Sequence, residues 1–479
     1  MSVLTEFDRY DGLALAELVR KREVTAGEIL EEAISRIEAR NPAINAVVTK
    51  MYDQARKAIA TGLPSGPFTG VPYVLKDLGA QYTGVVTAGG SRLFAGDVAD
   101  HDSELTIRLR RAGLVIAGKS NTPEMGLAPS TEPRLFGSTK NPWKVSHSAG
   151  GSSGGGAAAV AAGMLPMAHA TDGGGSIRIP ASCCGLFGLK PTRGRVSMAP
   201  DAGEGWGGAS VIHAVTRTVR DSAALLDATS GPALGDPYWA PPPPRPFLEE
   251  AGREPGKLRI ALNLTPWFAA EVDRECAEAA RDAARLCASL GHEVEEARPE
   301  FDEAKWRQAN RMIVAANSAA TLDARAALRG RPLAPDDVER LVWERVNDVR
   351  QFTASDYAMA TRITHLVGRQ VARFMERFDI ILKPTMAAPP WPLGVLDMMT
   401  TDTDRYLAAV FASIGFTALF NSTGQPAMSV PLAWSSSGLP LGVQFAARFG
   451  EEGTLFRLAA QLEAARSWAG RRPSLDTRS

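Results

Sequence analysis

The sequence contains few of the residues that build disulfide scaffolds, metal centres and histidine-dependent active sites. Its 479 residues include four cysteines and six histidines. Cysteines so few and so spaced form neither a disulfide framework nor a metal-ligand pattern. We therefore expect them to pack as small apolar residues in a reducing compartment. No histidine stands out as a catalytic base, and no metal or cofactor is predicted.

A net charge and a long apolar run are also missing. The 53 basic residues balance 53 acidic ones, which argues against an electrostatic footprint for nucleic acid or anionic lipid. No basic region followed by an apolar one opens the chain, and no apolar run reaches the length of a membrane span. With 45% hydrophobic residues the chain can bury a large core. We expect a cytoplasmic protein that binds small neutral molecules.

The stretch from Ser148 to Pro180 carries the strongest chemical signal. It holds two serines flanked by glycine, Ser152 and Ser176. Glycine lets the backbone approach a ligand closely and leaves a neighbouring hydroxyl uncrowded. The backbone N–H groups of Gly173, Gly174, Gly175 and Ser176 would be donors for a developing oxyanion. The pattern predicts an acyl-transfer site.

Three other interpretations of this stretch are weaker. The G-x-S-x-G match at Gly150 needs a hydrophobic strand before it, whereas residues 141–149 are polar and contain a proline. A partial dinucleotide fingerprint at Gly154 lacks the same strand. A flexible linker would not continue into AAAVAAGMLPMAHAT, which predicts a buried helix followed by a short strand.

A serine nucleophile needs a base, and Lys76 is the best candidate. It ends the apolar run 71–75, so a strand would carry its amine into the interior. Burial disfavours the charged form, and a neutral lysine can act as a base near pH 7. An ion pair with Asp77 and a lysine reaching for the surface are the competing interpretations, and spacing alone does not decide between them.

Motifs along almost the whole chain resemble the amidase signature family. They are GVPYVLKD around Lys76, GKSNTPEMG at 118–126, GGSSGG at 150–155, TDGGGSIRIPA at 171–181, GLKPTRGRVS at 188–197, NSTGQPAMSVPL at 421–432 and GLPLGVQ at 438–444. The resemblance implies that Ser176 is the nucleophile, that Ser152 is a bridging serine beside a cis peptide, and that Lys76 is the terminal base. It also implies that Asp172 and Arg178 brace the serine loop.

The resemblance leaves the substrate open. TEPRLFGSTKNPW at 131–143 and GLKPTRGRVS lean toward the cyclic-dimer hydrolase branch and related bacterial amidases, which implies linear, cyclic or aryl amides, with carbamates and esters accessible to the same chemistry. Met125 and Thr171 are predicted to contact substrate. Gly173 departs from the family pattern, where a larger residue is common, and so does Ala157, where Glu is frequent; the extra glycine is expected to loosen or widen the oxyanion loop.

We expect an α/β fold in one large domain, with a mixed sheet covered by helices on both sides. Within it we predict an N-terminal helical cover (1–65), a catalytic core (66–230), a proline-rich crossover (231–256), substrate-shaping helices (257–400) and a C-terminal core (401–479). A capping box at Thr25 starts a helix that should end at Pro42, and residues 403–421 should form one apolar helix.

Two alternatives of other classes remain at this point. A glutamine-dependent amidotransferase subunit would need a partner subunit and a charged pocket for glutamine. A catalytically silent binding protein on the same fold would not need Lys76, Ser152 and Ser176 together. A homodimer is compatible with the sequence, although no motif indicates it.

Overall fold

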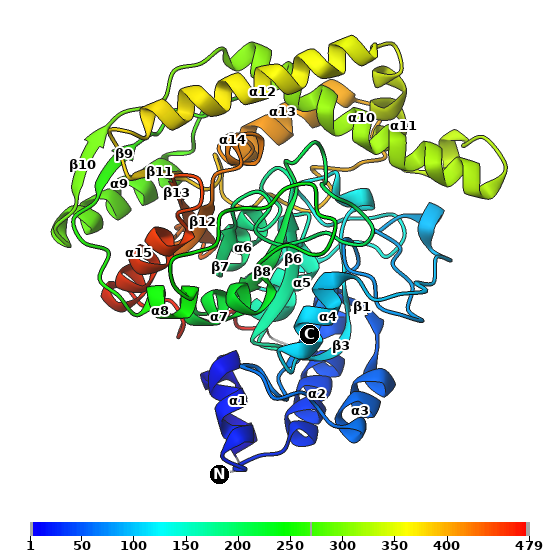
Figure 1. Ribbon diagram of the computed structural model, residues 1–479, viewed down its shortest axis with the longest axis vertical. Helices are drawn as coiled ribbons and strands as arrows, with labels where there is room; N and C mark the ends of the chain where they lie inside the picture. The colour runs from blue at the N-terminus through cyan, green and yellow to red at the C-terminus, as the bar shows by residue number, and fades with distance from the viewer. Residues whose placement is uncertain (1–2, 269–270, 476–479) are drawn as a thin grey trace.

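The computed structural model describes residues 3–268 and 271–475. Its centre is a mixed eight-stranded sheet (Figure 1). In spatial order the strands are β10 (Glu293–Glu296), β9 (Arg259–Leu262), β11 (Ile380–Pro384), β13 (Pro440–Ala447), β12 (Ala427–Trp434), β7 (Phe187–Lys190), β8 (Val211–Thr216) and β6 (Met167–Asp172). β10, β9 and β11 run parallel to one another, and the remaining neighbours are antiparallel.

A second sheet extends the first beyond β6. Its three strands are, in spatial order, β1 (Val47–Lys50), β3 (Val115–Ser120) and β2 (Pro72–Lys76). β2 lies beside β6, and every residue of both strands is buried. Strands buried along their whole length are typical of sheets covered on both faces. A small hairpin of β4 (Lys140–Asn141) and β5 (Lys144–Ser148) precedes the serine stretch.

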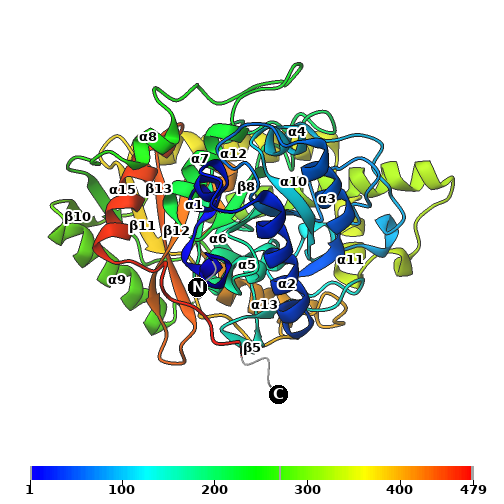
Figure 2. The same cartoon turned by 90° about the horizontal axis from the view of Figure 1, so that it is seen from below.

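Helices cover both faces of the sheets. They are α1 (Gly12–Arg20), α2 (Ala26–Ile44), α3 (Tyr52–Thr61), α4 (Glu104–Arg111), α5 (Gly154–Ala161), α6 (Arg178–Cys184), α7 (Val219–Thr229), α8 (Phe247–Ala251), α9 (Arg274–Ser289), α10 (Glu303–Arg329), α11 (Arg340–Val349), α12 (Ala354–Phe374), α13 (Thr403–Ile414), α14 (Leu419–Thr423) and α15 (Glu452–Ala465). Seen from below, α1, α2 and α3 lie in front of the central strands, while α9 and α15 flank β11, β12 and β13 (Figure 2). The single α/β domain predicted from the sequence is confirmed.

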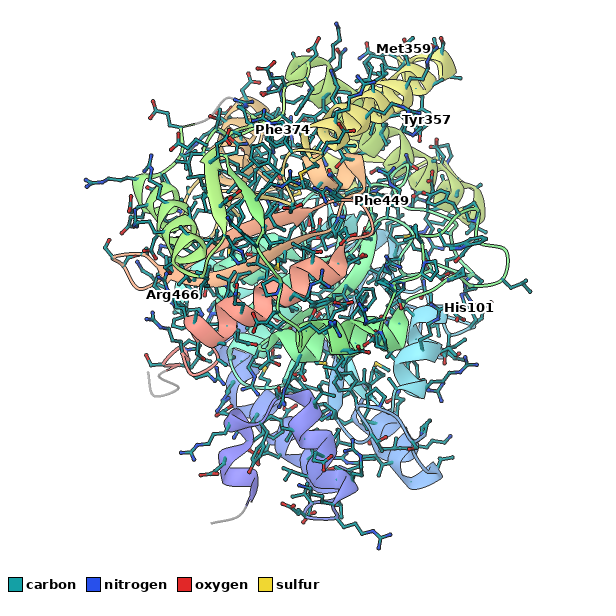
Figure 3. The ribbon with its side chains drawn as sticks, turned by 60° about the vertical axis from the view of Figure 1, so that its left-hand side comes forward. His101, Tyr357, Met359, Phe374, Phe449 and Arg466 are labelled. Carbon is teal, nitrogen blue, oxygen red and sulfur yellow. The ribbon has the colours of Figure 1, made fainter. Side chains whose placement is uncertain are left out.

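The long helices α10, α11 and α12 form a layer at the end of the molecule opposite α1 and α2 (Figure 1). Tyr357 and Met359 mark α12 in this layer (Figure 3). The Asn317 side-chain amide of α10 donates a hydrogen bond to the Tyr357 hydroxyl at 3.1 Å, which joins the two helices. No helix in the described ranges is both long and apolar enough to cross a bilayer.

The helix that begins at the capping box of Thr25 runs further than predicted. The box is present, since Glu28 N–H donates to Thr25 Oγ1 at 3.2 Å and Thr25 N–H donates to Glu28 Oε2 at 2.8 Å. The helix then passes through Pro42 and ends at Ile44. Proline removes one donor there, but the buried Ile44 and an N–H donated by Asn45 to Asn41 at 2.7 Å hold the last turn. The predicted stop at Pro42 was wrong.

Two further predictions of secondary structure need correction. Residues 403–421 belong to two helices rather than one: α13 ends at Ile414, and α14 begins at Leu419. Gly415, between them, packs so closely on Pro266 that a Cβ on it would lie 2.7 Å from the proline Cβ. The proline-rich crossover contains the short helix α8, whose Phe247 is buried. The four cysteines are free and buried, as their predicted packing requires.

Candidate active site

The glycine run before Ser152 is buried and tightly packed. A Cβ on Gly151 would lie 2.4 Å from the Ser130 carbonyl oxygen, and one on Gly155 would lie 2.3 Å from the Asn121 nitrogen. Only glycine allows backbone segments to approach so closely. The run is therefore a packed loop that leads into the buried helix α5, and the flexible-linker interpretation is wrong. The Gly151–Ser152 peptide is cis, as the family resemblance implies.

Lys76 ends β2 and points into the interior. Its Nζ donates hydrogen bonds to Ser152 Oγ at 2.7 Å and to Thr171 Oγ1 at 2.9 Å. Its backbone N–H donates to His169 Nδ1 on β6 at 3.0 Å. The fold thus brings together a lysine and a serine that are far apart in the sequence. Thr171, which we predicted to contact substrate, places its hydroxyl on the lysine.

The surroundings of Lys76 favour a neutral amine. Its side chain is 0% exposed, and burial lowers its pKa to about 7 against the opposing effect of the Asp172 charge. Within residues 3–268 and 271–475, no carboxylate oxygen lies within 4.0 Å of its amine, so both the ion pair with Asp77 and the surface lysine are excluded. Burial also lowers the pKa of His169, to about 3, so this ring is a neutral acceptor.

Ser176 follows β6 in a loop that Asp172 organises. The carboxylate of Asp172 accepts the Gly175 N–H at 2.7 Å and the Ile177 N–H at 3.1 Å. The N–H of Gly175 is therefore already used inside the loop. Gly174 has open space around it, since nothing lies within 4 Å of the position that a Cβ on it would take. Its carbonyl accepts a hydrogen bond from Thr417 Oγ1 at 2.6 Å.

Arg178 braces this loop from behind. Its guanidinium makes two hydrogen bonds of 2.9 Å to the Asp172 carboxylate and donates to the Thr417 carbonyl at 2.8 Å and to Gln444 Oε1 at 2.6 Å. Asn421 adds a bond of 2.8 Å to the same carboxylate. Burial alone would raise the pKa of Asp172, but the Arg178 charge and these hydrogen bonds hold it well below its usual range. The contacts match the bracing that the resemblance implies.

Ser176 opens into a pocket of about 160 Å³. The lining residues come from the loop after β3, the serine loop and the start of α6, the loop between β7 and β8, and the helices α10, α11 and α13. They are Gly126, Leu127, Ala128, Pro129, Gly174, Ser176, Ile179, Trp206, Val314, Arg345, Tyr406, Leu407, Val410 and Ile414. Gly126 links the pocket to the lysine, because a Cβ on it would lie 3.2 Å from Ser152 Oγ. Ser152 therefore lies next to the wall of the pocket that Ser176 lines.

The glycine at position 173 does not widen the loop as we expected. The ring of Trp206 occupies the space where a larger side chain would stand, since a Cβ on Gly173 would lie 2.5 Å from it. Trp206 holds the left-handed conformation with φ 51°, which is unusual for a bulky residue and is typical of functional sites. Met125 shares this conformation, also with φ 51°, immediately before the pocket residue Gly126. Met125 thus shapes the turn that carries the pocket wall.

Sequence reasoning missed several residues of this region. Thr417 and Trp206 lie outside the segments that we examined for chemistry, and Arg345 lies in a helix without any motif. Asn421 begins the quoted NSTGQPAMSVPL motif, but its role depends on contacts with Asp172, which lies 249 positions away in the sequence. The glycine-rich run around Trp206 was the one available signal, because glycines on both sides of a tryptophan indicate unusual backbone geometry.

Comparisons with known proteins agree with this geometry. The model of the Amidase family matches residues 28–456. The 6-aminohexanoate-cyclic-dimer hydrolase of Pseudomonas sp. (strain NK87) is 42% identical over 97% of this chain and 96% of its own length. A solved structure of 6-aminohexanoate cyclic dimer hydrolase superposes with a TM-score of 0.92 at 41% identity, over 97% of this chain and 98% of that one. A bacterial aryl acylamidase reaches 0.85 at 28% identity, over 96% and 99%. The chain therefore belongs to the amidase family and is a hydrolase that cleaves amide C–N bonds other than peptide bonds.

Proposed function

We propose that the enzyme works through an acyl group on Ser176, with Lys76 as base and Ser152 as the relay between them. The observation that carries the proposal is the 2.7 Å hydrogen bond from the buried Lys76 amine to Ser152 Oγ. A lysine with a pKa of about 7 is neutral in roughly half of the molecules at neutral pH, so it can accept a proton.

The proposed reaction has two halves. Lys76 takes the proton of Ser152, Ser152 takes that of Ser176, and the Ser176 oxygen attacks the amide carbon. The N–H groups of Gly173, Gly174 and Ser176 are the proposed oxyanion donors, since Gly175 donates to Asp172. The relay then returns the proton to the leaving amine. Water attacks the acyl-serine in the second half and releases the acid.

Thr171 and Met125 take positioning roles in this proposal. The Thr171 hydroxyl fixes the Lys76 amine at 2.9 Å, and Met125 sets the backbone of the pocket wall. The proposed catalytic residues all come from the predicted core, 66–230. The pocket wall draws on α10 and α11 from the predicted substrate-shaping segment, 257–400, and also on α13, which lies in the predicted C-terminal core, 401–479.

The substrate class follows from the pocket and the relatives. Apolar side chains line most of the pocket, which favours small amides with aliphatic or aryl groups. One relative is named for the hydrolysis of a cyclic dimer of 6-aminohexanoate, and another solved structure is named an aryl acylamidase. We propose linear, cyclic and aryl amides as substrates, with carbamates and esters accepted by the same acyl chemistry. Four free buried cysteines support a reducing, cytoplasmic location.

Glutamine is a poor fit for this pocket. Its α-ammonium group requires a carboxylate or several oxygen acceptors, whereas the lining contains no Asp or Glu. An amidotransferase role is therefore less well supported than direct hydrolysis. The intact contact between Lys76 and Ser152 argues equally against a silent binding protein.

Hydrolysis of a matched substrate set tests the proposal. The purified protein and its Ser176→Ala variant would be assayed with a p-nitroanilide, the corresponding p-nitrophenyl ester and a carbamate. We expect the wild type to cleave at least the anilide, the variant to cleave none, and a fluorophosphonate probe to label Ser176 in the wild type. Equal activity of the variant would show that the nucleophile lies elsewhere.

A further inference from the structure

Arg345 is the one charged side chain among the residues that line the Ser176 pocket. It comes from α11, and its recorded hydrogen bond is a long one, from Nη1 to the Leu127 carbonyl at 3.4 Å. In the part of the chain that the structure describes, no carboxylate oxygen lies within 4.0 Å of its guanidinium. The pocket that Ser176 lines therefore also contains a guanidinium without a carboxylate partner among the described residues.

The nearby arginines at the two ends of this segment, the first residue of α11 and the residue just after its last, both have carboxylate partners. Arg340 pairs with Glu344 at 2.9 Å, and Arg350 pairs with Asp323 at 2.6 Å, both on the protein surface. Arg345 instead lines the pocket together with the apolar residues Val314, Leu407 and Val410. Burial lowers its pKa, yet a guanidinium stays protonated in proteins. Among the described residues, the protein provides no carboxylate partner for this cation.

An anionic group on the substrate would supply that partner. The planar guanidinium matches a carboxylate with two parallel hydrogen bonds, and such charge-assisted bonds are among the strongest in proteins. Apolar side chains such as Val314, Leu407 and Val410 line the same pocket, and low polarity around a charge pair strengthens its attraction. An uncharged amide would leave the guanidinium without this compensation.

We propose that Arg345 binds a carboxylate of the substrate, so that the preferred amides carry a free carboxylate a few bonds from the scissile carbonyl. This inference rests on the proposed function, because it places the carboxylate in the same pocket as the acyl group. It narrows the substrate class from small amides in general to amido acids. The neutral amides named for the relatives would then be secondary substrates of this chain.

Two substrate series test the inference and distinguish the side of the scissile bond that carries the carboxylate. The p-nitroanilides of succinic, glutaric and adipic acid, each compared with its methyl ester, place the carboxylate on the acyl side. 4-Acetamidobenzoate, compared with its methyl ester, places it on the amine side. Neutral butanoyl p-nitroanilide reports hydrolysis that does not depend on the carboxylate.

The variants are Arg345→Met, Arg345→Lys and, as a matched control, Arg311→Met. Arg311 is exposed on α10 and pairs with Asp348 at 3.3 Å, so its replacement removes one nearby positive charge without altering the pocket lining. We expect the wild type to favour one acid over its ester by about 10- to 100-fold in kcat/KM, the size expected for hydrogen bonds to a charged group. Arg345→Met should abolish this preference mainly through KM, while Arg345→Lys keeps part of it and Arg311→Met all of it.

The outcomes separate the inference from the proposed function. If the wild type shows no preference for the acid in either series, or if Arg345→Met lowers hydrolysis of acid and ester equally, the carboxylate role is refuted although amide hydrolysis stands. If no substrate is cleaved, calorimetric titration of the Ser176→Ala variant with glutarate decides the question. Weaker binding after the additional Arg345→Met change supports the inference, and unchanged binding overturns it.

Discussion

The pH dependence of hydrolysis gives the most direct view of Lys76. If the neutral amine is the base, kcat/KM rises with pH as the lysine loses its proton and levels off above its pKa. With a pKa of about 7, the neutral fraction is about one eleventh at pH 6 and about ten elevenths at pH 8, so kcat/KM should increase about tenfold over this interval and then remain constant. A lysine with the usual value of 10.5 would instead give about a hundredfold increase over the same interval and a rate still rising at pH 9.

The assay is hydrolysis of neutral butanoyl p-nitroanilide from pH 5.5 to pH 9.5, below saturation and at constant ionic strength. Burial raises the pKa of Asp221 and Glu339 to about 7 as well, so the titrating group has to be identified. Loss of a proton from an ammonium absorbs much heat, whereas loss from a carboxyl group absorbs little. Warming should therefore move the midpoint to lower pH. A flat profile, or a midpoint that warming leaves in place, would refute a neutral lysine base.

Substitutions around the serine loop give further expectations. Ser176→Ala should abolish labelling by a fluorophosphonate. Lys76→Ala should lose most activity at neutral pH while circular dichroism shows a preserved fold, and wild-type rates from this variant would contradict the role of Lys76 as base. Ser152→Ala should lose somewhat less activity because substrate binding and the oxyanion donors remain. Gly173→Ala should clash with the Trp206 ring and destabilise the fold by about 1–3 kcal/mol, which lowers the melting temperature, whereas Gly174→Ala has open space and should melt like the wild type. Equal melting of the two variants would contradict this packing. Arg178→Met should cost about 3–5 kcal/mol in chemical denaturation because it leaves Asp172 buried without its cation; a loss below about 1 kcal/mol would show that Asn421 and the backbone donors suffice.

The sequence predicted local and repeated features well. The strand that ends in Lys76, the buried helix α5, the strand β6 and the capping box of α2 all depend on neighbouring residues, and the structure contains each of them. The family resemblance added the residues of the serine loop, because these belong to contiguous motifs. The hydrogen bond between Lys76 and Ser152 then followed from the fold.

The remaining features depend on contacts that no local pattern encodes. The break between α13 and α14 contains Gly415, which packs on Pro266, and Thr417, whose hydroxyl donates to the Gly174 carbonyl. Trp206 fills the space left by Gly173 although the two residues lie in different loops. Arg345 resembled any other helix arginine until the structure showed that the nearby Arg340 and Arg350 have carboxylate partners.

The contact between His169 and Lys76 determines how the two halves of the site are joined. Within the described residues, β2 and β6 belong to separate sheets, and the Lys76 N–H donates to an imidazole where a backbone carbonyl would otherwise accept it. Because Nδ1 is the acceptor, the ring proton has to stand on Nε2, and this junction tolerates only one tautomer. The His169 ring thus joins β2 to β6 and fixes the position of Lys76 relative to β6. A histidine that takes no part in the proposed proton transfer therefore determines the spacing of the groups that do.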